Sequence, residues 1–191
     1  MKAHSKIILA SQSPRRKQLL QWAELVFEVI VSHTDECYPA HLTPQEIALF
    51  IAQNKATAVQ NLIPYTDAII IAADTIVVIN NTILGKPINA EDAINMLTTL
   101  SGNIHQVITG VVIMQHNKIV SFADITQVEF NTLTKEQITF YIEKYKPYDK
   151  AGSYAIQEWI GVVGIKKITG DFFNVMGLPV SRVLQTLQQF N

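Results

Sequence analysis

The sequence predicts an α/β protein with a mixed, twisted sheet flanked by helices. Strand-like and helical patterns alternate at both ends of the chain, and consecutive strand-like runs fill its middle. An apolar fraction of 48% over 191 residues is enough for one full core, and a charged fraction of 16% is too low for a disordered chain. We expect a single domain, with a second and smaller lobe over about residues 84–148.

The chain opens with a pattern of strand, helix and strand. Lys6–Ala10 is a short apolar run that predicts a buried strand. Pro14 follows a polar turn and suits the first position of a helix, which we expect to extend to Trp22. Phe27–Val31 predicts the second strand.

A long helix and a doubly covered strand come next. Thr43 and Glu46 form a capping-box pattern, and Pro44 stands at the first helical position. The helix that begins there should end before Pro64. Ala68–Ala73 is a continuous apolar run, which is typical of a strand covered on both faces.

The middle of the chain predicts a hairpin and a helix. Asn80-Asn81 resembles a tight turn between short strands at Ile76–Ile79 and Thr82–Leu84. Asn89 is placed to cap a helix over Ala90–Leu100, which has acidic residues in its first turn.

Five further elements complete the prediction. We expect long strands at Ile104–Met114 and Ile119–Phe130, a helix from Thr134 to about Lys144, a strand at Ile160–Ile168 and an amphipathic helix at Leu178–Phe190.

Composition excludes several classes of protein. Fifteen Lys and Arg against sixteen Asp and Glu leave a net charge of −1, which argues against general binding to nucleic acid or to a membrane surface. The longest apolar run, Ala68–Ala73, is far too short for a membrane span, and the short apolar run near the N-terminus is no signal peptide. One cysteine, Cys37, excludes a disulfide framework and a cysteine-only metal site. We expect a cytoplasmic protein.

Glycine distribution narrows the kind of phosphate site that the chain can hold. The first glycine is Gly85, so neither a Walker A loop nor a dinucleotide-binding glycine motif can occur in the N-terminal half.

The first candidate site is the turn between the first strand and the first helix. It holds Ser11, Ser13, Arg15 and Arg16, and two of the three arginines of the chain stand together here. Free N–H groups at a helix start, hydroxyl groups and paired guanidinium groups all favour a phosphate. The alternative is an ordinary helix cap beside solvated charges.

Acidic residues supply the second and third candidates. Asp74 follows the apolar run at what we expect to be the carboxyl end of a strand, where α/β sheets commonly bind ligands. It could bind a divalent cation or activate a water molecule; alternatively, it caps the turn. Asp35-Glu36 lies in a loop and could hold a hard cation such as Mg²⁺; alternatively, both charges are solvated.

Scattered polar residues form the fourth candidate group. Lys55 lies within the second helix, Lys86 stands in a rigid Gly-Lys-Pro turn, and Gln157 ends a strand-like stretch and could hydrogen-bond a base edge. Each could instead be an ordinary surface residue. His105 reads as a hydrogen-bonded structural histidine.

Taken together, these segments resemble the Maf family of nucleotide pyrophosphatases over nearly the whole chain. The resemblance rests on motifs in a fixed order: L-A-S-x-S-P-R-R at Leu9–Arg16, Glu36, Lys55, A-D-T at Ala73–Thr75, L-G-K-P at Leu84–Pro87, S-G-x-x-H-x-V-x-T at Ser101–Thr109, D-K-A-G-x-Y-x-I-Q at Asp149–Gln157 and G-L-P at Gly177–Pro179.

The resemblance implies an elongated, two-lobed α/β fold with a central cleft, similar to inosine triphosphate pyrophosphatases. It implies hydrolysis of dTTP and UTP to the nucleoside monophosphate and pyrophosphate, with a divalent cation (Mg²⁺ or Mn²⁺) as cofactor, and it implies a homodimer. By the same resemblance Asp74 is the proton acceptor, and Arg15, Thr75 and Gln157 are specificity residues. The phosphate- and metal-binding set comprises Ser11, Ser13, Arg16, Glu36, Lys55 and Lys86, and Glu36 with Asp74 would hold the metal.

Two other functions stay open at this point. One is a nucleotide-binding regulator of cell division and septum formation with little or no hydrolysis. The other is direct nucleic-acid binding, which the net charge and the lack of an arginine-aromatic stripe disfavour.

Overall fold

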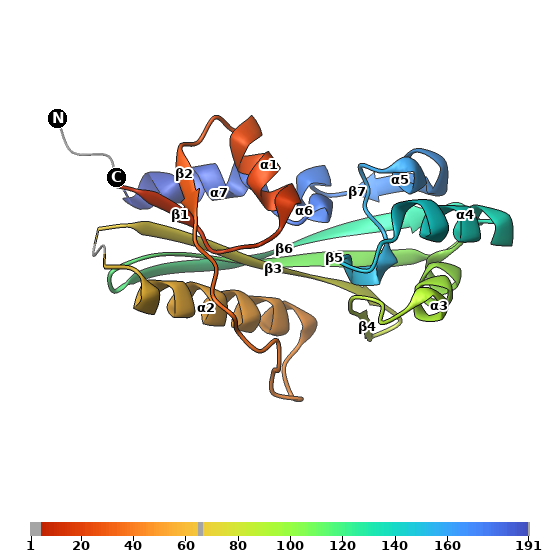
Figure 1. Ribbon diagram of the computed structural model, residues 1–191, viewed down its shortest axis with the longest axis horizontal. Helices are drawn as coiled ribbons and strands as arrows, with labels where there is room; N and C mark the ends of the chain where they lie inside the picture. The colour runs from red at the N-terminus through yellow and green to blue at the C-terminus, as the bar shows by residue number, and fades with distance from the viewer. Residues whose placement is uncertain (1–4, 65–66, 191) are drawn as a thin grey trace. The chain divides into compact units, whose positions relative to one another are not determined.

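The computed structural model describes residues 5–64 and 67–190 (Figure 1). Its strands are β1 (Ile7–Leu9), β2 (Phe27–Val29), β3 (Ile69–Ile79), β4 (Thr82–Leu84), β5 (Ile104–Gln115), β6 (Lys118–Phe130) and β7 (Ile165–Thr169). Its α-helices are α1 (Pro14–Trp22), α2 (Pro44–Leu62), α3 (Ala90–Leu100), α4 (Lys135–Tyr145), α5 (Trp159–Gly164), α6 (Phe172–Met176) and α7 (Val180–Leu187). Short 3₁₀ turns occur at Ala151–Ser153 and Gln188–Phe190.

Within the described residues the strands form one seven-stranded sheet in the order β2-β1-β3-β5-β6-β7, and β4 pairs with β3 outside this path. β1 runs parallel to both β2 and β3, whereas β4 is antiparallel to β3 and β7 is antiparallel to β6. The predicted α/β class with a mixed sheet is therefore confirmed.

The chain divides into two compact units. Unit 1 contains the residues up to Asp74, Thr109–Asp124 and the residues from Gly177 on, and unit 2 contains Thr75–Ile108 and Ile125–Met176. β3, β5 and β6 each supply residues to both units. The expected smaller lobe over residues 84–148 and the expected cleft stay predictions.

Local sequence signals account for the helix starts. Ser13 caps α1, Asn89 caps α3, and α2 begins with a complete capping box. In that box the backbone N–H of Thr43 donates to Glu46 Oε2 at 2.8 Å, and the Glu46 N–H donates to Thr43 Oγ1 at 3.4 Å. The bond from the Thr43 backbone lowers the pKa of the Glu46 carboxyl.

In unit 1 the sheet is covered on both faces, by α2 on one side and by α1 and α7 on the other (Figure 1). The face toward α2 is built by every second residue of the strands, as the alternation of a strand requires. It packs against small residues of the helix, and the cluster comprises Ile8, Ala10, Ala52, Ala56, Val59, Ala68, Ile70, Ala72, Val112 and Met114.

The contact between α2 and β5 is very close at Gly110. A Cβ atom at this position would lie 2.4 Å from the carbonyl carbon of Ala48 and 2.5 Å from the nitrogen of Leu49. Because both neighbours are backbone atoms of the helix, only glycine fits here without a shift of α2.

In unit 2, α3 packs against α4, and an aromatic cluster lies nearby in the core. His105 is buried, its Nε2 lies 2.7 Å from the Tyr154 hydroxyl, and its ring lies 5.4 Å from that of Phe130. Burial lowers the pKa of His105 to about 4. The prediction of a hydrogen-bonded structural histidine is confirmed.

The predicted strand at Ile160–Ile168 is wrong in its first half, where the chain forms α5 instead. Ile160 and Gly164 are buried while Val162 is 84% exposed, which is a helical rather than an alternating pattern. The run of β-branched residues was therefore misleading. The last helix is also shorter than predicted, since α7 covers Val180–Leu187 and ends in a 3₁₀ turn.

Candidate active site

The turn between β1 and α1 is ordered by its own serines. The Ser13 N–H donates to Ser11 Oγ at 3.2 Å, and Ser13 Oγ accepts from the Arg16 N–H at 3.4 Å as the helix cap. These bonds stabilise the turn at the N-terminus of α1, where the helix dipole favours an anion.

Arg16 is buried beneath this turn and is part of its framework. Its Nη1 donates to Ser11 Oγ at 3.1 Å and its Nε donates to the Gly177 carbonyl at 2.7 Å. Burial lowers the pKa of the guanidinium, and the charge of Arg15 adds to this effect. The alternative in which both arginines are solvated charges is therefore wrong for Arg16, while Arg15 is half-buried.

Lys55 joins the two candidate carboxylates. Its Nζ lies 2.6 Å from Asp74 Oδ1 and 3.0 Å from Glu36 Oε1. The side chains of Lys55 and Asp74 are 18% and 12% exposed, whereas that of Glu36 is 48% exposed. Three segments far apart in the sequence thus place two carboxylates and one ammonium group within hydrogen-bond distance.

Strand alternation explains why Lys55 and Asp74 meet. Ala68, Ile70 and Ala72 face α2, so Asp74, two residues further along β3, lies on the same face. On α2, Lys55 lies three residues after Ala52, which packs on that face.

Asp74 does not lie at the end of its strand, as we predicted, but inside β3, which continues to Ile79. The neighbouring parallel strand β1 pairs with β3 only through Ile71, and Ala10 makes the last backbone bond to it. Asp74 therefore lies just past the carboxyl end of β1, where the Ser11 turn leaves the sheet. We predicted a ligand site at the carboxyl end of the strand that carries Asp74. The strand that ends at this position is β1, whereas β3 continues past it.

Electrostatics connects the serine-arginine turn with the carboxylates. The charges of Asp74 and Glu36 both act to raise the pKa of Arg16, against the lowering by burial. The group contains three cationic side chains (Arg15, Arg16 and Lys55) and two anionic ones (Glu36 and Asp74), for a formal charge of +1. Such a group has both the positive charge for phosphate and the carboxylates for a cation.

The other three predicted residues belong to unit 2. Thr75 is the residue after Asp74 in β3, Lys86 follows β4, and Gln157 is exposed in a turn before α5, not at the end of a strand as predicted. Gly152, in the motif that Gln157 ends, contacts both β3, which carries Thr75, and the turn that carries Lys86. Its N–H donates to the Gly85 carbonyl at 3.0 Å, and a Cβ atom there would lie 3.0 Å from the Val77 side chain.

Two glycines matter structurally: Gly110 has no signal in the sequence, and Gly177 stands in the G-L-P motif without a predicted role. Gly177 supplies the carbonyl that accepts from Arg16, and Gly110 allows α2 to approach the sheet. Gly177 has a φ of 113°, a value suited to glycine, which explains a glycine at the start of the G-L-P motif.

The carboxylates suit a hard divalent cation better than zinc. Mg²⁺ is commonly held by one or two carboxylates together with substrate phosphates, and Glu36 and Asp74 converge on one point, the Lys55 ammonium. In the described part of the chain no three His, Cys, Asp or Glu side chains come together, and Cys37 is exposed.

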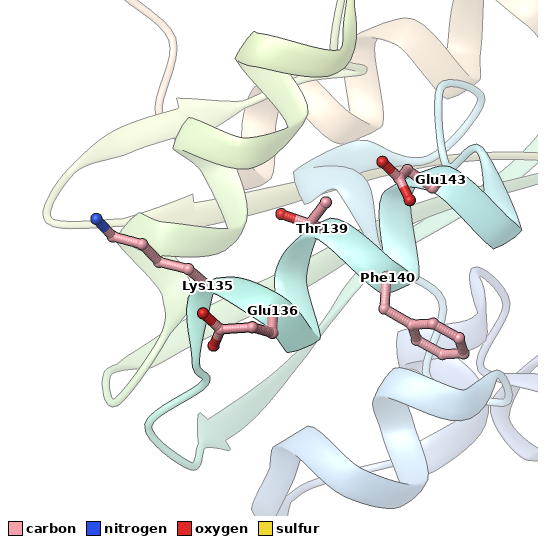
Figure 2. A pocket seen from close by; sticks show the side chains of 5 residues that line it. All are labelled: Lys135, Glu136, Thr139, Phe140 and Glu143. Atoms are coloured by element: carbon pink, nitrogen blue, oxygen red, sulfur yellow. The ribbon is translucent and has the colours of Figure 1, made fainter.

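A surface hollow of about 370 Å³ lies elsewhere, on the outer side of α4. None of the predicted site residues lines it. Figure 2 shows the residues that do: Lys135, Glu136, Thr139, Phe140 and Glu143.

No helix among residues 5–64 and 67–190 is long and apolar enough to cross a membrane.

In this mixed α/β fold, arginines, a lysine and carboxylates gather at the end of one strand. Side chains of these kinds are typical of a site that binds phosphorylated small molecules. The sequence model of the Maf-like protein family matches residues 6–190, and the chain belongs to this family.

Several curated relatives are named dTTP/UTP pyrophosphatase. A dTTP/UTP pyrophosphatase of Cytophaga hutchinsonii is 53% identical over 183 residues, which cover 96% of this chain and 83% of the relative. Proteins with the same name from Parabacteroides distasonis and Bacillus cereus are 50% and 47% identical, and each alignment covers 97% of this chain and 96% of the relative.

Proposed function

We propose that this protein is a nucleoside triphosphate pyrophosphatase that hydrolyses dTTP and UTP to the nucleoside monophosphate and pyrophosphate. Membership of the Maf-like family and the names of relatives at about half identity over nearly the full chain support the reaction class. The observation that carries the proposal at the level of residues is the Lys55 bridge between Asp74 and Glu36 beside buried Arg16.

In this proposal the serine-arginine turn and the lysines bind the phosphates. Arg15, Arg16, Lys55 and Lys86 supply positive charge, and Ser11 and Ser13 line the turn. Because Ser11, Ser13 and Arg16 already hydrogen-bond one another, this turn needs little reorganisation when a phosphate binds. Preorganised charge of this kind is the main contribution that a protein makes to phosphoryl transfer.

Asp74 is the proposed proton acceptor. It takes the proton of the attacking water as the water oxygen bonds to the α-phosphorus. The bond from that phosphorus to the bridging oxygen breaks, and pyrophosphate leaves with the bridging oxygen and the bonding electron pair. Lys55 holds the carboxylate of Asp74 in place through the 2.6 Å hydrogen bond. Glu36 and Asp74 would hold a divalent cation, Mg²⁺ or Mn²⁺, whose charge neutralises the triphosphate when it is bound.

Arg15, Thr75 and Gln157 are the proposed specificity residues. Their side chains offer a guanidinium, a hydroxyl and an amide, which can hydrogen-bond the sugar or the edge of a base.

The test is the release of pyrophosphate from a panel of canonical and modified nucleoside triphosphates, with Mg²⁺ and with Mn²⁺. We expect high activity on dTTP and UTP. A preference for purines such as dITP would overturn the substrate assignment, and nucleotide binding without turnover would favour a regulator.

Asp74→Asn tests the catalytic assignment. We expect it to lower turnover by about 10²–10⁴-fold, the range for loss of a general base, while the unfolding curve stays close to that of the wild type. Asp67→Asn is the matched control, because the Asp67 side chain is 86% exposed, and it should leave turnover unchanged. Near-normal turnover of Asp74→Asn would contradict the assignment. The homodimer stays a prediction, which sedimentation would test.

A further inference from the structure

Gln157 occupies the tip of a tight turn. The Glu158 N–H donates to the Ala155 carbonyl at 3.1 Å, so Ala155–Glu158 is a four-residue turn with Gln157 in its third position. Ala155 and Ile156 are each 5% exposed, whereas Gln157 is exposed. The turn thus anchors its first two residues in the core of unit 2 and presents the amide of Gln157 outward.

One buried hydroxyl binds both ends of this turn. Tyr141 lies on the inner face of α4 and is fully buried. Its hydroxyl oxygen accepts from the Ala155 N–H at 3.1 Å, and the hydroxyl donates to Glu158 Oε2. Because a phenol can donate and accept at once, a single side chain connects the first and the last residue of the turn.

The Glu158 carboxylate is held from a second side. Lys150, whose side chain is 9% exposed, places its Nζ 3.5 Å from Glu158 Oε1 and 2.7 Å from Asp149 Oδ1. Lys150 and Asp149 open the same D-K-A-G-x-Y-x-I-Q motif that Gln157 ends. The motif therefore closes on itself through Glu158, the residue that follows it.

The chain after the turn packs closely against it. The Gly161 N–H donates to the Glu158 carbonyl at 2.9 Å. A Cβ atom at Gly161 would lie 1.7 Å from the Ile156 carbonyl oxygen, so the start of α5 lies directly against the turn. The turn is thus held by α4 on one side and by α5 on the other.

We propose that Tyr141, with Glu158 as its partner, is a positioning residue that holds Gln157 in the orientation needed to recognise the pyrimidine base. The inference rests on the proposed function, and within it on a hydrogen bond from Gln157 to the edge of the base. A recognition group on a rigid turn loses less conformational freedom on binding than one on a mobile loop. Tyr141 itself is buried and acts only through the turn.

The experiment compares Tyr141→Phe with the wild type on dTTP and dCTP. Thymine presents a carbonyl where cytosine presents an amino group, so the ratio of the two kcat/KM values measures base recognition. We expect Tyr141→Phe to lower this ratio about tenfold, mainly through a higher KM for dTTP, because it removes the hydrogen bonds that fix the turn. Gln157→Ala should lower the ratio at least as much, and the double variant should be no worse than Gln157→Ala alone.

Tyr145→Phe is the matched control. Tyr145 lies on the same helix and its ring stacks on that of Tyr141 at 5.0 Å, but its hydroxyl has no hydrogen bond to the Ala155–Glu158 turn among the described contacts. It should keep the wild-type ratio. If Tyr141→Phe does not fold, Glu158→Ala tests the same connection from the partly exposed end and should give the same loss.

An unchanged ratio in a folded Tyr141→Phe or Glu158→Ala variant, beside a lowered ratio in Gln157→Ala, would overturn the positioning role and leave the proposed function intact. Additive losses in the double variant would also overturn it. An unchanged ratio in Gln157→Ala would overturn the role of Gln157 and the positioning role together. Failure of the wild type to hydrolyse dTTP would instead refute the proposed function.

Discussion

Gly110→Ala is a stringent test of how the fold builds the site. A methyl group at this position would lie 2.4 Å from the carbonyl carbon of Ala48, and ordinary contact with a Cβ atom begins at 3.4 Å. The backbone of α2 must therefore move away from β5 by about 1 Å, the difference between the two distances, since backbone atoms cannot rotate aside as a flexible side chain can.

This displacement should affect both stability and catalysis. Overpacking of this kind costs about 1–3 kcal/mol of the free energy of unfolding. The same helix carries Lys55, whose Nζ lies 2.6 Å from Asp74 Oδ1. A rigid shift of α2 by about 1 Å directly away from β3 would lengthen this separation to at most about 3.6 Å, beyond hydrogen-bond distance. A misplacement of that size at a catalytic group can lower activity by about 10²-fold.

The measurements are urea unfolding and pyrophosphate release from dTTP. Gly85→Ala is the control for stability, because no atom lies within 4 Å of a Cβ atom at Gly85. A Gly110→Ala protein with a free energy of unfolding within about 0.5 kcal/mol of the wild type, the range of ordinary surface substitutions, and with normal turnover would refute this account of the α2 contact.

Three further predictions concern other parts of the molecule. Lys55→Met should lower kcat/KM for dTTP by about 10²-fold, because Asp74 and Glu36 lose their shared cation; unchanged kinetics would count against the bridge. Thr43→Ala should lower the free energy of unfolding by about 1 kcal/mol through loss of the α2 cap, measured by urea unfolding, and an unchanged midpoint would contradict the cap. His105 should make stability depend on pH: burial lowers its folded-state pKa to about 4 from 6.5, so the unfolded chain binds the proton first as the pH falls. Stability should therefore decrease by about 3 kcal/mol between pH 7 and pH 4, and His105→Gln should flatten that part of the profile in urea unfolding; an equally steep profile in the variant would refute the assignment.

Much of the fold is predictable because short-range signals are strong at particular residues. The starts of α1, α2, α3 and α4 lie where the sequence predicts them, and each is capped by a side-chain bond over three residues. The Asn80-Asn81 hairpin turn is also confirmed, and both residues have a positive φ, as a tight hairpin turn requires.

The errors occur where packing overrides local preference. The β-branched run before Ile165 favours a strand by its composition, yet the contact of Gly161 with the Ile156 carbonyl fits a helix start. At Asp74 a polar residue interrupts the apolar run, yet β3 continues to Ile79 and its later residues pair with β4.

The sequence therefore suffices for the α/β class, the starts of the main helices and the family, because these depend on neighbours within a few residues or on ordered motifs. It also names Asp74, Glu36, Lys55, Arg15 and Arg16 as separate candidates. That Lys55 bridges the two carboxylates, that Arg16 is buried against Gly177, and that Tyr141 holds the turn of Gln157 depend on the tertiary structure. The reason is physical: these contacts join residues on different elements, and only the packing of those elements brings them within hydrogen-bond distance.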